Sequence, residues 1–144
     1  MPFATISSSS AAPPISDPAA RELRILLVED SVPLQVRLVE LLTHAGVMQV
    51  TGIADTESAA LELIESQCFD VMVVDVELRQ GSGITVVRKT RARQGQPPFP
   101  LIIILTNYGL NSVRDRCLAA GADHFLDKML EFNRLYPLIS AAKS

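Results

Sequence analysis

The chain has no tryptophan, few aromatic residues (5%) and only two cysteines among its 144 residues. A core built from this composition has to be mainly aliphatic. Cys68 and Cys117 do not have the spacing of a metal or redox motif. We therefore expect both thiols to be small buried apolar side chains in a reducing compartment.

Long apolar runs and clusters of basic charge are also missing. The longest apolar stretches, such as residues 101–105, are far too short to cross a bilayer. The first residues lack the basic segment and apolar stretch of a secretory signal. With a net charge of −3 and no long Lys/Arg run, the sequence predicts a cytoplasmic protein that binds neither nucleic acid nor membrane.

Composition divides the chain into a tail and one domain. Residues 1–21 are rich in serine, alanine and proline, and such a segment buries too little apolar surface to fold by itself. We expect a flexible tail at 1–21 and a single domain at 22–144. No further domain is expected after the last helix, so output is expected to pass through protein contacts.

Short apolar runs alternate with segments of helical periodicity from residue 23 onward. The expected strands lie at residues 25–28, 47–53, 71–74, 101–105 and 125–126. The helix after the first strand is expected to end at Gly46, and the last helix contains Pro137, which has to lie in its first turn or kink it. This pattern predicts an α/β fold, a (βα)5 doubly wound parallel sheet of five strands in the flavodoxin-like order 2-1-3-4-5.

Polar side chains follow four of the expected strands. Glu29 and Asp30 follow the first strand, Asp75 the third, Thr106 the fourth and Lys128 the fifth. In a doubly wound sheet these positions meet at the carboxyl edge, where ligands bind. Three clustered carboxylates repel one another and need a cation, and a set of oxygen ligands favours Mg²⁺.

The same residues suit phosphoryl transfer to a carboxylate, which depends mainly on positioning and charge neutralisation. Asp75 is the natural acceptor, because Glu29 and Asp30 are adjacent and suit metal binding. Lys128 supplies a compact positive charge for a tetrahedral anion, and Thr106 supplies a hydroxyl donor.

From residue 23 to about 142 the chain resembles the receiver domain of response regulators, of the stand-alone, single-domain type. The matching features are residues 26–30 ending in two acids, Asp75, Gly83 eight residues later, Thr106 after an apolar run, residues 119–123, and Phe125 three residues before Lys128.

The resemblance implies a switch in bacterial two-component signalling. A histidine kinase or histidine phosphotransfer protein would phosphorylate Asp75, and the backbone carbonyl of Glu77 would complete the Mg²⁺ site. Thr106 would then move toward the phosphoryl group and Phe125 would follow. The surface of the fourth helix, fifth strand and fifth helix would change for a downstream protein target, or the phosphoryl group would pass onward in a relay. Such a protein catalyses only its own phosphorylation and dephosphorylation and is otherwise not an enzyme.

Some positions depart from the family pattern. Arg79 and Met129 stand where proline is common, and Asn107 stands where a small residue is common. Together with Tyr108 and Glu77, Asn107 is expected on the rim of the site. Pro137 leaves the formation of a homodimer through the last helix open.

Two alternative functions remain at this point. A degenerate receiver would act only as a docking module. A small phosphatase that forms an aspartyl-phosphate would need a second aspartate two residues after Asp75, where this chain has Glu77.

Overall fold

The structure is a computed structural model that describes residues 21–93, 99–107 and 110–143. Most of the predicted tail (residues 1–20) and the rim candidate Tyr108 lie outside the described residues. In chain order, the elements are β2 (Leu23–Val28), α1 (Val32–Leu41), β3 (Met48–Ala54), α2 (Glu57–Ser66), β4 (Val71–Val74), α3 (Gly83–Ala92), β5 (Leu101–Thr106), α4 (Asn111–Ala120), β6 (His124–Asp127), the 3-10 helix η3 (Phe132–Arg134) and α5 (Leu135–Ala141).

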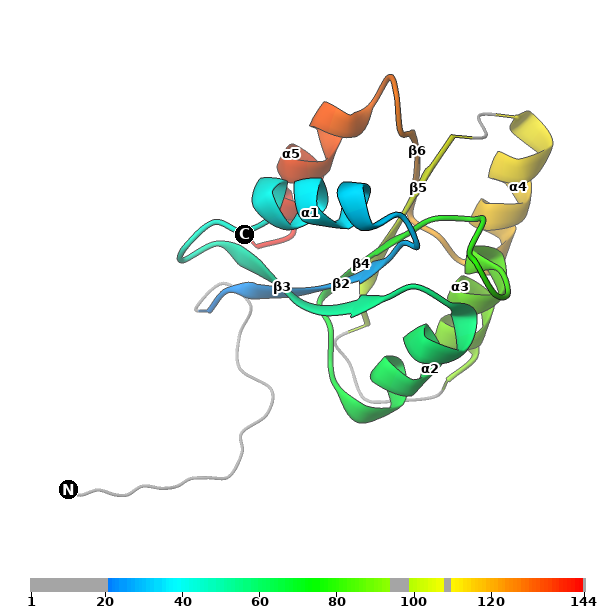
Figure 1. Cartoon of the computed structure of the whole chain (residues 1–144), viewed down its shortest axis with the longest axis horizontal. Helices are drawn as coiled ribbons and strands as arrows, with labels where there is room; N and C mark the ends of the chain where they lie inside the picture. The colour runs from blue at the N-terminus through cyan, green and yellow to red at the C-terminus, as the bar shows by residue number, and fades with distance from the viewer. Residues whose placement is uncertain (1–20, 94–98, 108–109, 144) are drawn as a thin grey trace.

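The five strands form one parallel sheet in the order β3-β2-β4-β5-β6. This is the predicted flavodoxin-like order. Helices α1 and α5 lie on one side of the sheet, and α2, α3 and α4 lie on the other (Figure 1). The chain changes direction across the sheet between β2 and β4, so the carboxyl ends of these two strands form the switch point.

Each face of the sheet has its own core because strand side chains alternate between the faces. Leu26 and Val28 pack with apolar residues of α2, α3 and α4. Ile25 and Leu27 pack with apolar residues of α1 and α5. All four side chains are fully buried, which explains why residues 25–28 of β2 form a continuous apolar run.

Short polar side chains begin the first three helices. Ser31, Thr56 and Ser82 each accept a hydrogen bond from a backbone N–H in the first turn of α1, α2 and α3. Helix α4 ends at Gly121, whose φ of 118° is readily adopted only by glycine. Pro137 lies in the first turn of α5, one of its two predicted placements.

The predicted end of the first helix is wrong. Helix α1 ends at Leu41 rather than near Gly46. The N–H of His44 donates to the carbonyl of Met48, and Gly46 lies in the turn between them with a φ of 81°. The tight turn into β3 therefore competes with the last helical turn, and glycine marks that turn instead of the helix end.

The two cysteines also differ from the prediction. Cys117 is fully buried, and burial raises the pKa of its thiol to about 11. Cys68 is exposed. It follows α2 in the connection to β4, where its side chain reaches solvent.

An ion-pair cluster lies at the amino edge of the sheet, opposite the carboxyl ends of the strands. Both guanidinium Nη atoms of Arg21 donate to the carboxylate of Asp70, at 2.7 and 2.9 Å, and the backbone N–H of Arg24 donates to it at 2.8 Å. Burial alone would raise the pKa of Asp70, but these hydrogen bonds outweigh it and lower the pKa to about 2. The cluster ties the start of β2 to the start of β4.

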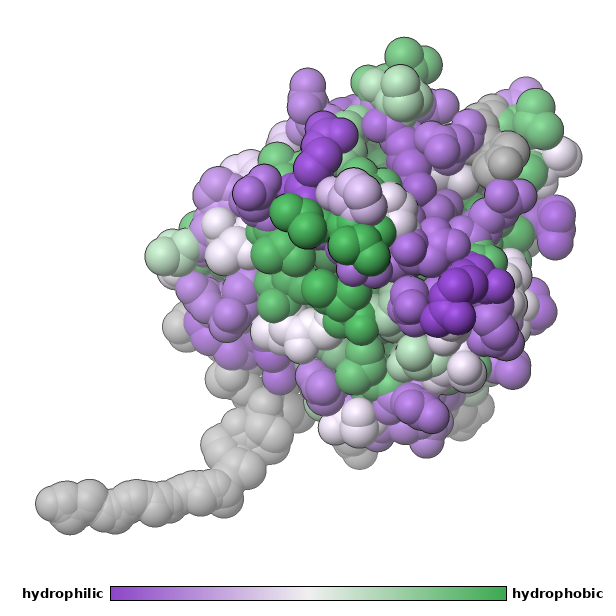
Figure 2. All heavy atoms as spheres, viewed as in Figure 1, coloured by the Kyte–Doolittle hydropathy of each residue, from purple (hydrophilic) through white to green (hydrophobic). Residues whose placement is uncertain are grey.

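Figure 2 shows apolar atoms gathered on the visible face where α1 and β3 reach the surface. The exposed large apolar residues of these two elements are Val32, Val36 and Ile53. None of the described helices has both the length and the apolar character needed to span a membrane.

Candidate functional site

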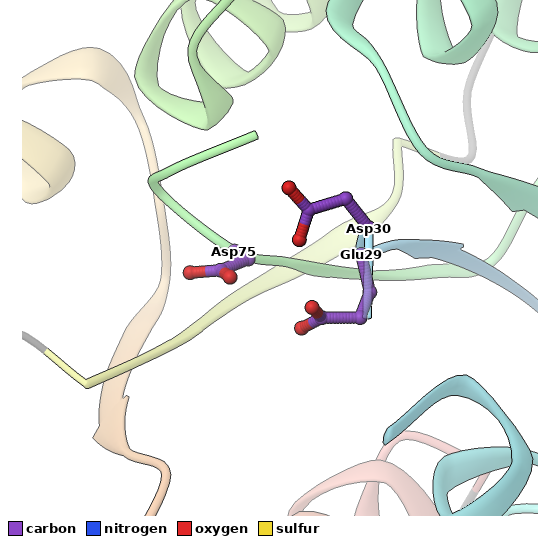
Figure 3. A group of neighbouring side chains, drawn as sticks. All are labelled: Glu29, Asp30 and Asp75. Atoms are coloured by element: carbon purple, nitrogen blue, oxygen red, sulfur yellow. The ribbon is translucent and has the colours of Figure 1, made fainter. Parts of the chain in front are cut away.

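The three predicted acids meet at the switch point between β2 and β4. Glu29 and Asp30 directly follow β2, and Asp75 directly follows β4. The backbone N–H of Asp75 donates to the carbonyl of Val28 at 2.9 Å, so hydrogen bonds of the sheet fix the two strand ends side by side. One carboxylate oxygen from each acid lies within 4.8 Å of the others. Figure 3 shows Glu29 and Asp30 projecting toward the end of β4 that carries Asp75.

The first residue of α3 packs directly against the backbone of Asp75. A Cβ atom at Gly83 would overlap the carbonyl oxygen of Asp75 and would lie 2.8 Å from its carbonyl carbon. Only glycine fits there without moving one of the two segments. This close approach explains the glycine eight residues after Asp75.

Lys128 supplies the positive charge of the site. Its Nζ atom lies 2.8 Å from Oδ2 of Asp75 and 2.9 Å from Oε1 of Glu29. Burial alone would lower the pKa of Lys128, but hydrogen bonds and charge from the two carboxylates outweigh it, and the pKa is raised. Lys128 therefore stays protonated across the physiological range, and it joins β6 to the ends of β2 and β4.

Glu29 is the more deeply placed acid of the adjacent pair. Its side chain is only 4% exposed, and its Oε2 accepts a hydrogen bond from the N–H of Ser31 at 3.0 Å. Burial and the neighbouring charge of Asp75 raise the pKa of Glu29, whereas the interactions with Lys128 and Ser31 lower it. The effect of burial is the largest, and the pKa is raised overall. Asp30 is half-buried, so the two acids have different access to solvent.

Thr106 and Phe125 lie on β5 and β6, the two strands beyond β4 in the sheet. Thr106 is the last residue of β5 and is fully buried, and its carbonyl accepts a hydrogen bond from the N–H of Lys128 at 2.9 Å. Phe125 is half-buried against the core beneath α2, α3 and α4. The structure thus brings Thr106 to the predicted edge and places Phe125 toward the side of the sheet that carries α4.

A hollow of about 310 Å³ opens above the acids. It is lined by Glu29, Asp30, Ser31, Asp75, Glu77, Leu78, Asn107 and Lys128. Glu77 and Asn107, the two described rim candidates, are exposed on its wall. The hollow admits a small tetrahedral anion beside Asp75.

Sequence reasoning missed the contacts that hold the loop at residues 76–82, which forms one wall of this hollow. The N–H of Glu57 donates to the carbonyl of Gln80 at 2.9 Å. Oε1 of Glu57 accepts from the N–H of Ser82 at 3.0 Å, and Arg79 forms an ion pair with Asp55 at 2.9 Å. These contacts join segments more than 20 residues apart, and no local pattern in the sequence indicates them.

The donor set of the site fits a small divalent cation. Ligand oxygens around octahedral Mg²⁺ lie about 2.1 Å from the ion. The three carboxylate oxygens lie within 4.8 Å of one another, so they need only a slight contraction of the site, or one bridging water, to coordinate the ion. Three carboxylates against the one ammonium of Lys128 leave two negative charges uncompensated when all are ionised. A divalent cation would balance that charge.

Fold and site together define an α/β protein with an acidic site at the switch point of a doubly wound parallel sheet. Residues 25–140 match the response regulator receiver domain family. The chain belongs to this family and is a receiver domain of two-component signalling, in which phosphorylation controls a switch.

Curated relatives are larger proteins that carry a similar domain. The chain is 36% identical over 110 residues to a protein-glutamate methylesterase/protein-glutamine glutaminase of Pseudoalteromonas atlantica, a match that covers 75% of this chain and 28% of that protein. It is 29% identical over 126 residues to the transcriptional regulatory protein PdtaR of Mycobacterium tuberculosis, which covers 88% of this chain and 59% of that protein. In both cases the chain spans less than two thirds of the relative.

Solved receiver domains share the fold. The receiver domain of sensor histidine kinase PA1611 from Pseudomonas aeruginosa, solved with a magnesium ion coordinated in its active site cleft, has a TM-score of 0.69 and 28% identity and covers 85% of this chain and 98% of its own. The response regulator domain of Thermotoga maritima CheB has a TM-score of 0.70 and 23% identity, with coverage of 85% and 95%.

Proposed function

We propose that the chain is a phosphorylation switch in which Asp75 accepts a phosphoryl group from a phosphohistidine, with Mg²⁺ bound beside it. The observation that carries this proposal is the ammonium of Lys128 within 2.9 Å of both Asp75 and Glu29, inside a cluster of three carboxylates. This arrangement concentrates the charges that phosphoryl transfer requires at one edge of the sheet, where β2, β4 and β6 end.

In the proposed reaction a carboxylate oxygen of Asp75 attacks the phosphorus of the donor. A bond forms between oxygen and phosphorus while the bond from phosphorus to the imidazole nitrogen breaks, and the electron pair stays on that nitrogen. Lys128 lies where it pairs with an oxygen of the transferred group, and Thr106 lies at the end of the neighbouring strand as a hydroxyl donor. Attack of water on the aspartyl-phosphate later restores the Asp75 carboxylate and releases inorganic phosphate.

Glu29, Asp30, Asp75 and the backbone carbonyl of Glu77 would hold the Mg²⁺ ion. The bound ion supplies charge neutralisation for the carboxylates and the phosphoryl oxygens. The solved PA1611 receiver domain, with magnesium in its active site cleft, supports the choice of metal.

We further propose that a histidine kinase or histidine phosphotransfer protein is the donor and that a protein target or a further relay step receives the signal. Phosphorylation would alter the surface of α4, β6 and α5, because Thr106 and Phe125 lie on β5 and β6, at the edge of the sheet that these elements surround. The chain would catalyse only its own phosphorylation and dephosphorylation.

Incubation with acetyl phosphate and Mg²⁺ tests this proposal. Intact-mass analysis is expected to show one added phosphoryl group per chain, lost when EDTA replaces Mg²⁺, and peptide mapping is expected to place it on Asp75. Asp75→Asn is expected to remain unlabelled, whereas Asp115→Asn, which removes an exposed acid from α4, is expected to label normally. Labelling of Asp75→Asn at the wild-type level would refute the assignment. Absence of label on the wild type would favour a docking module, and rapid turnover of an external phosphate ester would favour a phosphatase.

A further inference from the structure

The loop at residues 76–82 is fastened to the start of α2 by the side chain of Glu57. We propose that Glu57 is a positioning residue for the metal and phosphoacceptor site, because it fixes the turn that carries the Glu77 carbonyl. This inference rests on the proposed function, in which that carbonyl is a metal ligand. Glu57 itself is not among the residues that line the hollow.

The loop is a closed hairpin in which Glu77 and Ser82 lie opposite each other. They form an antiparallel bridge, and the N–H of Gly83 donates to the carbonyl of Val76 at 2.9 Å. Oε1 of Glu57 accepts the N–H of Ser82 at 3.0 Å. The carboxylate therefore acts on the residue directly across the hairpin from the proposed ligand.

Among the charged side chains that hold this loop, Glu57 is the least exposed to solvent. Its side chain is 19% exposed, whereas the ion pair between Arg79 and Asp55 is 64% and 46% exposed. Exposed ion pairs contribute little, because water and salt screen them. A hydrogen bond from a backbone N–H to a shielded carboxylate is stronger, so the Glu57 carboxylate contributes more to the attachment of the loop than the pair of Arg79 and Asp55 does.

The packing around Gly81 shows how closely the two segments fit. A Cβ atom at Gly81 would overlap the Cβ atom of Glu57, and Gly81 has a φ of 83°. At the other end of the turn, Gly83 lies against the carbonyl of Asp75. The turn is thus held between Glu57 on one side and Asp75 on the other, and residues 81–83 connect a shift at Glu57 to the site.

Mg²⁺ titration of three variants by calorimetry, at a temperature where all are folded, tests the inference. Glu57→Ala removes the acceptor for the Ser82 N–H and is expected to weaken Mg²⁺ binding by about tenfold, the lower end of the range for groups that orient metal ligands. Glu57→Gln keeps an oxygen that accepts this hydrogen bond and is expected to restore most of the affinity. Glu62→Ala removes an exposed acid more than one turn further along α2 and is the control for the lost charge.

Amide hydrogen exchange without metal provides a second readout. Exchange at Ser82 and Gly83 is expected to accelerate in Glu57→Ala and to stay at the wild-type rate in Glu57→Gln and Glu62→Ala. Wild-type Mg²⁺ affinity in Glu57→Ala would overturn the inference while leaving the proposed function intact. If Glu57→Gln weakens Mg²⁺ binding as much as Glu57→Ala does, the inference is also overturned, because the loss of negative charge, and not the loss of positioning, would then explain the weaker binding. A wild-type protein that neither binds Mg²⁺ nor labels on Asp75 would instead refute the proposed function, and the inference with it.

Discussion

The ammonium of Lys128 lies 2.8 Å from Oδ2 of Asp75 and so connects β6 to β4, two strands that are separated in the sheet by β5. Neither side chain is more than 11% exposed. The pair therefore contributes to the stability of the sheet edge as well as to the charge of the site.

Replacement of Lys128 by methionine is expected to destabilise the metal-free protein. Removing one partner of a buried ion pair leaves the other charge uncompensated, and we expect a loss of about 3 kcal/mol in the free energy of unfolding, the lower end of the range for such pairs. Urea denaturation in EDTA measures this loss, and added Mg²⁺ is expected to stabilise the variant more than the wild type. Arg88→Met, at an exposed position of α3, is the control. Unchanged stability of Lys128→Met in EDTA would show that the pair has no structural role.

Replacement of Asp30 by asparagine is expected to separate metal binding from folding. The variant is expected to lose most of its affinity for Mg²⁺, because one of the three clustered carboxylates is gone. It is expected to melt no lower than the wild type without metal, because repulsion among the acids decreases. Calorimetric titration and thermal denaturation in EDTA measure the two effects. If affinity is retained, Asp30 is not a metal ligand.

Asp70 is expected to control acid stability from the opposite edge of the sheet. Its pKa in the folded protein is about 2, against 3.8 for the free side chain. Its stabilisation is therefore fully present above about pH 4 and is lost as the pH falls through about 2, an effect on the order of 2 kcal/mol. Asp70→Asn is expected to be less stable than the wild type at pH 7 and to lose less stability between pH 4 and pH 2. Parallel acid profiles of the two proteins, from urea denaturation at each pH, would contradict this.

Asn107 is expected to limit access to the phosphoacceptor. It is exposed and lines the hollow that contains Asp75 and Lys128. Asn107→Ala is expected to speed phosphorylation by small donors and spontaneous dephosphorylation alike, because an in-line water or donor approaches more freely. Both rates follow from intact-mass time courses at fixed Mg²⁺. Equal or slower rates in the variant would mean that Asn107 does not restrict the approach.

The sequence predicted the sheet and the meeting of the acids because both depend on short-range patterns. Apolar runs end sharply at Glu29 and at Asp75, and in a parallel sheet those ends share one edge. The end of α4 also depends on a local preference, because Gly121 readily adopts the left-handed conformation that ends the helix. The chemical roles of these residues stay predictions until the labelling experiment is done.

Features that depend on contacts between distant segments were not predicted. The attachment of Glu57 to Ser82 joins residues 25 positions apart, and nothing near either residue indicates it. The early end of α1 depends on the turn that His44 forms with Met48, which competes with helical hydrogen bonds of similar strength. The exposure of Cys68 depends on where a loop reaches the surface, and cysteine itself favours burial.

Because of the position of β6, the charges of the site also affect how easily this strand opens. This strand lies at the edge of the sheet and pairs with β5 on one side only, within the described residues, and Lys128 directly follows it. Edge elements open locally at a lower free-energy cost than central strands. Any local opening of β6 that withdraws Lys128 leaves Glu29 and Asp75 facing each other without their counter-charge. The two carboxylates therefore raise the free-energy cost of opening β6, although they form no backbone hydrogen bond with that strand.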